Sequence, residues 1–219
     1  METAKLEVPG SKPVTLLKVA GLCGVVCPVI AVTGIWVAIS YAPWFSWTGN
    51  SLSDLGGVAG ETPVWAARGT ASVVFNASLI IDGILTLLFA LGLRNSPRLG
   101  TRVGRWGVLL FILGACALGG IGLFPKTMGG IHALFSLSFF FLLPLSMLLV
   151  GAATLKSNKV LGWFAIALGI IGLSPMFIPW PWEGRAISNV ISISTMIAFA
   201  VVFGIRLLKQ SYKSNLGIS

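Results

Sequence analysis

The sequence predicts an all-α, polytopic membrane protein with six transmembrane helices. Hydrophobic residues make up 56% of the 219 residues and charged residues only 10%, whereas a soluble domain carries about 25% charged residues. Six apolar runs approach the roughly 20 residues that a helix needs to cross a bilayer core of about 30 Å. Lys and Arg are concentrated in alternate connections between these runs, which is typical of cytoplasmic loops.

The six predicted spans follow one another with short connections, except after the first. They cover approximately residues 16–41, 70–93, 105–124, 130–154, 160–179 and 187–208. These runs are longer than barrel strands and do not alternate in polarity, so they are predicted to be helices. A cytoplasmic N-terminal segment (1–15), an outer loop (42–69) and a cytoplasmic tail (209–219) complete the organisation. The first run is too long for the apolar region of a cleavable signal peptide.

The positions of Lys and Arg predict that both termini are cytoplasmic. The predicted inner segments contain Lys5, Lys12, Lys18, Arg94, Arg98, Arg102, Arg105, Lys156, Lys159, Arg206, Lys209 and Lys213. The predicted outer segments contain only Arg68, Lys126 and Arg185. This distribution follows the positive-inside rule and indicates a multi-pass protein of the cell membrane. It also explains the net charge of +9, so nucleic acid is not expected as a partner.

The outer loop contains an unusual concentration of aromatic and hydrogen-bonding residues. Residues 41–54 read Tyr-Ala-Pro-Trp-Phe-Ser-Trp-Thr-Gly-Asn-Ser-Leu-Ser-Asp. Ser51 and Asp54 have the spacing of a capping box, which predicts a short interfacial helix that ends at Gly56-Gly57. The connection 179–185 is also rich in Trp and Pro, whereas the inner connections are short and basic. Any functional site is therefore predicted at the outer face.

Asp82 is predicted near the middle of the second span, where a carboxylate costs a few kcal/mol to insert. It must therefore face the bundle, be protonated or find a partner. No Lys or Arg is expected at the same depth in any span, which leaves Ser and Thr hydroxyls as partners. In the alternative interpretation, Asp82 is a member of a proton relay rather than a buried carboxyl group bonded to a hydroxyl. The third span is rich in Gly and is expected to lie inside the bundle.

The outer-loop motifs resemble a known family. The run Pro43-Trp44-Phe45-Ser46-Trp47, followed by Asn50-Ser51-Leu52-Ser53-Asp54-Leu55-Gly56, is similar to the signature of the DUF998 membrane proteins. The other matching features are Phe75-Asn76, Gly122-Leu123-Phe124-Pro125 and His132. The resemblance covers roughly residues 20 to 205 and is greatest to the archaeal branch. It implies a six-helix membrane fold without an established activity.

The sharpest functional hypothesis is a lipid-ester hydrolase at the outer face. His132, Asp54 and Ser53 are its candidate catalytic residues, because a carboxylate can orient an imidazole that activates a hydroxyl. Candidate ligand-binding residues are Asn50, Asn76, Trp47, Glu183 and Arg185. The expected ligand is a membrane lipid. In the alternative interpretation these residues are structural: Ser51 and Asp54 cap a helix, Asn76 bridges helices, and His132 binds a loop carbonyl.

Two further function classes stay open at this point. The protein can be a lipid-binding protein without enzymatic activity, or a structural or assembly subunit that contacts other membrane subunits. His132, Asp54 and Glu183 are the only outer set that could bind a metal, and no metal site is expected from one histidine. The resemblance implies a loose relation to other small multi-pass proteins, some suspected of lipid hydrolysis. Such lipid hydrolases use several histidines for a metal, whereas this sequence has one. No cofactor is expected, since the sequence contains no phosphate-binding loop, dinucleotide fingerprint or haem-attachment motif.

Overall fold

The structure, a computed structural model, describes residues 11–96 and 99–216, with side chains from residue 14 onward. Most of the predicted N-terminal segment, including Lys5, lies outside the described residues, as do Arg98, the side chain of Lys12 and the last three residues of the predicted tail. The statements below concern the described residues.

Six long helices make up most of the structure. They are α1 (Ser11–Ser40), α2 (Thr70–Arg94), α3 (Arg102–Leu123), α4 (Gly130–Thr154), α5 (Lys159–Leu173) and α6 (Ala186–Asn215). Three short 3-10 helices are η1 (Leu52–Gly56), η3 (Lys126–Met128) and η4 (Ser174–Met176). All six long helices are long and apolar enough to cross a membrane, and the described residues contain no strand. The predicted fold class is confirmed.

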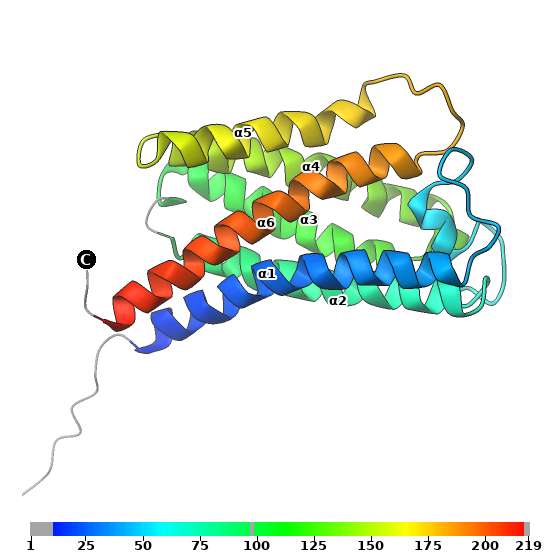
Figure 1. Cartoon of the computed structure of the whole chain (residues 1–219), viewed down its shortest axis with the longest axis horizontal. Coiled ribbons are helices and arrows are strands. Elements are labelled where there is room, and N and C mark those ends of the chain that lie inside the picture. The colour runs from blue at the N-terminus through cyan, green and yellow to red at the C-terminus, as the bar shows by residue number, and fades with distance from the viewer. Residues whose placement is uncertain (1–10, 97–98, 217–219) are drawn as a thin grey trace, which may run out of the picture.

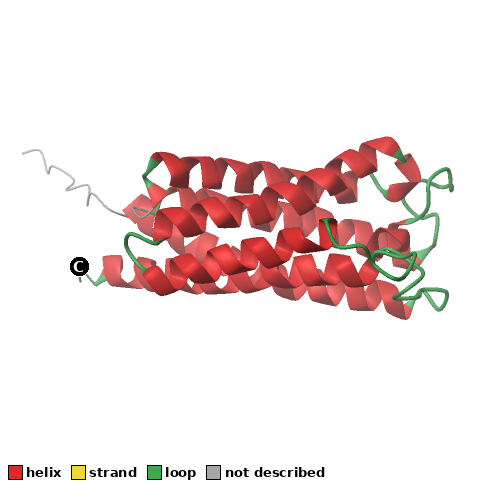
Figure 2. Cartoon of the chain, turned by 90° about the horizontal axis from the view of Figure 1, so that it is seen from above, coloured by secondary structure: helices red, strands yellow, loops and turns green. Residues whose placement is uncertain are grey.

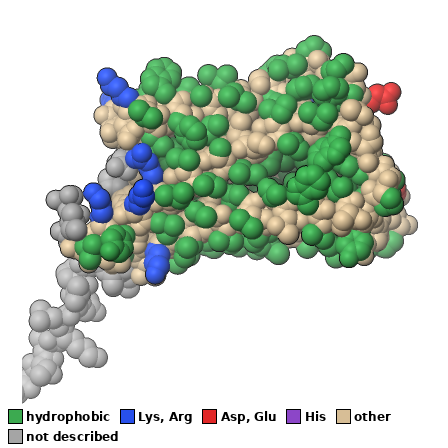
Figure 3. Space-filling view, in the orientation of Figure 1, with side chains coloured by type: hydrophobic (Ala, Val, Ile, Leu, Met, Phe, Trp, Pro, Cys, Tyr) green, Lys and Arg blue, Asp and Glu red, His purple; other side chains and the backbone are tan. Residues whose placement is uncertain are grey.

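The six helices run up and down in one bundle (Figures 1 and 2). Each helix packs against the next in sequence, and α6 packs against α1 to close the ring. The start of α1 and the end of α6 lie at one end, which we call the terminal end. The loop between α1 and α2 lies at the opposite end with η3 and η4, and we call this the loop end. Basic side chains gather at the terminal end (Figure 3).

Glycines allow the helix backbones to approach closely at two contacts. A Cβ atom at Gly83 would lie 2.5 Å from the Cα atom of Gly119, so α2 and α3 meet backbone to backbone there. A Cβ atom at Gly21 would lie 2.8 Å from the carbonyl oxygen of Gly204, where α1 crosses α6. Among the six spans α3 has the largest buried share, 50%. It still has an exposed face, with Trp106 57% and Leu113 46% exposed, so it is one of the ring of helices rather than a helix inside the bundle.

Two helix ends differ from the predicted spans. α5 ends at Leu173 rather than near 179, and the 3-10 helix η4 follows with Pro175 at its start, where proline supplies no N–H for an α-helical hydrogen bond. α6 continues to Asn215, beyond the predicted end at 208. Its last turns are held against α1, since Ser211 is buried and its hydroxyl donates to the carbonyl oxygen of Val14 at 3.1 Å. Residues 209–215 of the predicted tail are therefore helical.

Candidate functional site

The Asp54 carboxylate organises the loop end. The side chain is 7% exposed, and it lies in η1, directly after the aromatic part of the loop. Ser51 and Asp54 form the predicted capping box. The Ser51 backbone N–H and Asn50 Nδ2 donate to Asp54 Oδ2 at 2.9 and 3.1 Å, and the Ser51 hydroxyl donates to Asp54 Oδ1 at 2.9 Å. Two consecutive loop residues, Asn50 and Ser51, thus donate three hydrogen bonds to one carboxylate.

Lys126, from η3, completes this arrangement from a distant part of the chain. Its ammonium group forms an ion pair with Asp54 and donates to the Ser51 hydroxyl at 3.1 Å. Burial raises the pKa of Asp54, but the hydrogen bonds from Lys126, the Ser51 backbone and Asn50 outweigh it and hold the pKa below its usual value. The carboxylate is therefore ionised at neutral pH, and it joins the α1–α2 loop to the α3–α4 connection.

The α1–α2 loop is also bound to α2 and α6. Asn76 is 1% exposed, and its Nδ2 donates to the carbonyl oxygen of Gly56 at 3.4 Å. The backbone N–H groups of Gly184 and Ala186 donate to the carbonyl oxygens of Thr48 and Asn50 at 2.8 and 2.9 Å. The loop therefore contacts α2 near its start, the connection before α4, and the turn that leads into α6. It covers the loop end of the bundle.

A pocket of about 270 Å³ lies beneath this loop, and we call it the loop-end pocket. η1, η3, η4, α4 and α6 contribute to its lining. Its polar lining residues are Ser51, Ser53, Lys126, His132, Ser136, Arg185, Ser188, Asn189 and Ser192. Lys126 forms an ion pair with Asp54, whereas the exposed Arg185 guanidinium has no hydrogen-bond or ion-pair partner within the described chain. The pocket therefore offers an available positive charge beside several hydroxyl groups.

His132 lies in the first turn of α4 and is 5% exposed. Its Nδ1 atom is 2.8 Å from the carbonyl oxygen of Phe124, and its Nε2 atom is 3.3 Å from the hydroxyl oxygen of Ser136. A carbonyl oxygen can only accept, so Nδ1 carries the proton, and Nε2 of the neutral ring accepts from Ser136. The geometry is that of a serine hydroxyl bound to an oriented imidazole.

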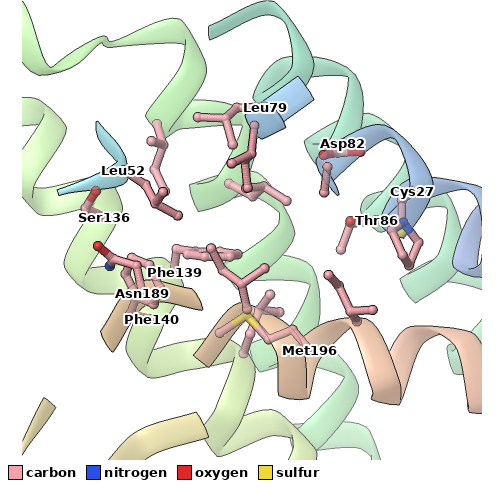
Figure 4. Close-up of a pocket in the computed structure, with 18 of the residues that line it drawn as sticks. Cys27, Leu52, Leu79, Asp82, Thr86, Ser136, Phe139, Phe140, Asn189 and Met196 are labelled. Atoms are coloured by element: carbon pink, nitrogen blue, oxygen red, sulfur yellow. The ribbon is translucent and has the colours of Figure 1, made fainter. Parts of the chain in front are cut away.

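A second, apolar space reaches from the loop end into the middle of the bundle. This mid-bundle cavity has a volume of about 100 Å³. Its lining is dominated by aliphatic and aromatic side chains, among them Phe75, Phe111, Phe139 and Phe140. Polar side chains lie at its two ends: Asp82 and Thr86 at one, and Ser136 and Asn189 at the other (Figure 4). Ser53 also lines the cavity.

The loop-end pocket and the mid-bundle cavity share part of their lining. Ser53, Ser136, Phe140 and Asn189 line both. The mid-bundle cavity also takes lining residues from α1 and α6, and the surface is hollowed between these two helices (Figure 3). A polar, positively charged pocket at the loop end thus adjoins an apolar cavity on the side of the bundle.

The candidate residues from the sequence fall into three groups. Ser53, His132 and Arg185 line the loop-end pocket. Asp54, Asn50 and Asn76 lie outside both linings, where they hold the loop. Trp47 and Glu183 also lie outside both linings; Trp47 packs against Trp36, with ring centroids 6.0 Å apart, and Glu183 is exposed.

The proposed pairing of Asp54 with His132 is not made in this structure. Within the described residues no hydrogen bond joins the two side chains: Asp54 binds Lys126, Ser51 and Asn50, while His132 binds Phe124 and Ser136. These contacts match the structural roles that the sequence analysis kept open.

Sequence reasoning missed Lys126 and Ser136 as site residues. Ser136 follows His132 by four residues, and this spacing places two side chains on the same face of a helix. That signal was present in the sequence. The pairing of Lys126 with Asp54 had no local signal, because 72 residues separate them. Of the two serines of α6 in the pocket lining, Ser192 bonds across the bundle, to the Gly172 carbonyl oxygen at 2.8 Å, whereas Ser188 bonds to the Arg185 carbonyl oxygen just before α6.

Comparison with known proteins identifies one family. Residues 25–206 match the family model described as Protein of unknown function (DUF998). No curated protein and no solved structure matches the chain.

Proposed function

The chain belongs to the DUF998 family, whose description assigns no function, and we propose from its geometry that it binds an anionic amphiphile such as a membrane lipid. The head group occupies the loop-end pocket, and the apolar chain extends into the mid-bundle cavity. The observation that carries this proposal is the shared lining of Ser53, Ser136 and Asn189, which connects a positively charged pocket to an apolar cavity.

The charges of the loop-end pocket favour an anionic head group. Arg185 has no side-chain partner in the described part of the protein, and Lys126 is still one-third exposed while it binds Asp54. A guanidinium group can bind a phosphate or carboxylate through two parallel hydrogen bonds. The hydroxyl groups of Ser188 and Ser53 line the same pocket and can donate to further oxygens.

The hollow between α1 and α6 supports entry from the bilayer (Figure 3). In a six-span protein this surface faces lipid, so an acyl or prenyl chain can reach the mid-bundle cavity sideways without leaving an apolar environment. The phenyl rings of Phe75, Phe139 and Phe140 line its route.

The test compares lipid binding by the wild-type protein with lipid binding by the variant Arg185→Gln. The purified protein in detergent is titrated with a short-chain phosphatidic acid and with the phosphatidylcholine of the same chain length, and bound lipid is counted by native mass spectrometry. Loss of a charge-assisted contact worth about 1.5–3 kcal/mol predicts at least a tenfold loss of phosphatidic acid binding. Lys156→Gln removes an exposed charge at the terminal end and serves as the matched control. Equal binding by both variants would reject the proposal.

A second candidate function is hydrolysis of an ester bond, favoured by the contact between Ser136 and His132. Ser136 lies where the two spaces meet, which is where the ester that links head group to chain would lie. His132 Nε2 would take the Ser136 proton as the hydroxyl attacks the carbonyl, and would return it to the departing alcohol. Water would then release the acid and regenerate Ser136.

A fluorophosphonate probe distinguishes hydrolysis from binding alone, because it forms a covalent bond only with an activated serine. The enzyme predicts labelling that Ser136→Ala abolishes and His132→Gln strongly reduces, with lipid binding retained by Ser136→Ala. Ser138→Ala changes a serine of the same helix that lines neither space and is the control. Absence of labelling in the wild-type protein would leave binding as the function.

A further inference from the structure

Asp82 is the polar side chain whose environment the proposed function does not explain. It lies on α2 and is 2% exposed. Neither of its carboxylate oxygens has a hydrogen-bond partner within the described chain. A buried carboxylate is strongly unfavourable unless it is paired or hydrogen-bonded. Its two unpartnered oxygens can accept hydrogen bonds from a ligand that enters the cavity.

The side chains around Asp82 offer it no compensating charge. It lines the end of the mid-bundle cavity together with Thr86, one turn further along α2, and Cys27 of α1 (Figure 4). No Lys, Arg or His is among the residues that line this cavity. The positive groups Lys126 and Arg185 line the loop-end pocket instead. The cavity is therefore rich in hydrogen-bond acceptors at its Asp82 end and lined mostly by apolar side chains between its two polar ends.

We propose that the Asp82 end of the mid-bundle cavity binds a hydrophobic cation, namely an amine or ammonium group on an apolar body. The ammonium N–H groups would donate to the two free oxygens of Asp82 and neutralise its charge. The rings of Phe75, Phe111 and Phe139 line the same cavity, so its walls suit the apolar body of such a ligand. The apolar body would occupy the remainder of the cavity and enter through the hollow between α1 and α6.

This site is separate from the head-group site, and it needs neither Arg185 nor Ser136. The loop-end pocket contains the positive Arg185 and favours an anion, whereas the Asp82 carboxyl group in the mid-bundle cavity favours a cation. A lipid chain and a hydrophobic cation would both occupy the mid-bundle cavity, so the two ligands are expected to compete.

The test uses 2-phenylethylammonium as the cation and 2-phenylethanol as its neutral counterpart of similar shape. Both are titrated calorimetrically into the full-length protein in nanodiscs, with empty nanodiscs as the blank. The wild-type protein should bind the ammonium at least tenfold more tightly than the alcohol, and Asp82→Asn should remove this difference. Glu183→Gln removes an exposed acid that lines neither space, so it should bind as the wild type does.

Equal affinity for the ammonium and the alcohol in the wild-type protein would overturn the proposal, as would undiminished ammonium binding by Asp82→Asn. A second measurement uses the wild-type protein, so it does not depend on whether Asp82→Asn folds. Dicyclohexylcarbodiimide modifies a carboxyl group in an apolar site, and peptide mass spectrometry locates the adduct. The ammonium should slow modification of Asp82 at least several-fold, whereas the alcohol should not. Unchanged modification, or none at Asp82, would also contradict the proposal.

The two sites can fail independently. Arg185→Gln should weaken phosphatidic acid binding and leave ammonium binding intact, and Asp82→Asn should do the reverse. Loss of both ligands in a variant that keeps the wild-type melting temperature would count against separate sites.

Discussion

Asp54→Asn is the variant that tests most directly how the loop end is held together. In the wild-type protein two donors reach each carboxylate oxygen: Asn50 Nδ2 and the Ser51 N–H at Oδ2, and the Ser51 hydroxyl and Lys126 at Oδ1. An amide keeps only one oxygen, so its NH2 group must face two of these donors. The Ser51 hydroxyl can rotate and accept, but Lys126 cannot. The main loss is therefore one charge-assisted hydrogen bond.

That loss is worth about 1.5–3 kcal/mol of unfolding free energy. A change of 1 kcal/mol shifts the melting temperature of a protein of this length by about 2–4 °C, so a fall of roughly 3–12 °C is expected. Thermal unfolding can be followed by Trp fluorescence in a fixed detergent. Glu183→Gln, at an exposed position, should stay within about 0.5 kcal/mol of the wild type.

A double-mutant cycle with Lys126→Met assigns the loss to the ion pair. If Asp54 and Lys126 stabilise each other, the double variant should lose less than the sum of the single variants. Additive losses, or an Asp54→Asn protein that melts with the wild type, would refute the role assigned to the pair.

The same pair predicts a pH dependence. Burial raises the pKa of Asp54, but its hydrogen bonds keep it below the usual value. Its contribution is therefore fully present above the unfolded pKa of about 3.9, and it is lost as the pH falls through the lower folded value. The difference in melting temperature between wild type and Asp54→Asn should be constant from neutral pH to about pH 5 and should shrink in more acidic buffer. A difference that grows on acidification would contradict this sign.

Three further variants test packing and the surface by the same melting assay. Gly83→Ala places a methyl group against Gly119 and should destabilise by about 1–3 kcal/mol; a neutral result would mean that α2 and α3 can move apart freely. Asn76→Ala leaves the buried Gly56 carbonyl unpaired and should cost about 1–3 kcal/mol, with no change expected if water replaces the amide. Arg68→Ala removes an ion pair at the surface and should change stability by less than about 1 kcal/mol.

The fold was predictable because its determinants are local. The length of the apolar runs sets the number of spans, and each DUF998 motif is a run of a few residues that can be recognised by itself. The capping box of Ser51 and Asp54 was predictable for the same reason. The end of α5 was misjudged because the apolar run continues past Pro175, and length was given more weight than the backbone constraint of proline.

The candidate site was only partly predictable because it depends on contacts between distant segments. Composition suggested Asp54 and His132 as a pair. In the fold Lys126 from η3 binds the carboxylate, and the Phe124 carbonyl oxygen accepts the hydrogen bond from the imidazole N–H. Burial of Asp82 could be inferred from its place in an apolar run. That its oxygens have no partner could not be inferred, since this requires knowing which side chains of α1, α3 and α6 face it.

The contacts of the α1–α2 loop have a consequence for assembly. Helix pairs α1–α2, α3–α4 and α5–α6 can each enter a membrane as a hairpin, and association of the inserted helices is a later stage. The loop takes partners from all three hairpins: Asn76, Lys126 and the N–H groups of Gly184 and Ala186. It can therefore close only after the last hairpin has arrived. A chain that lacks its third hairpin could be inserted and apolar throughout, yet it would contain no loop-end pocket.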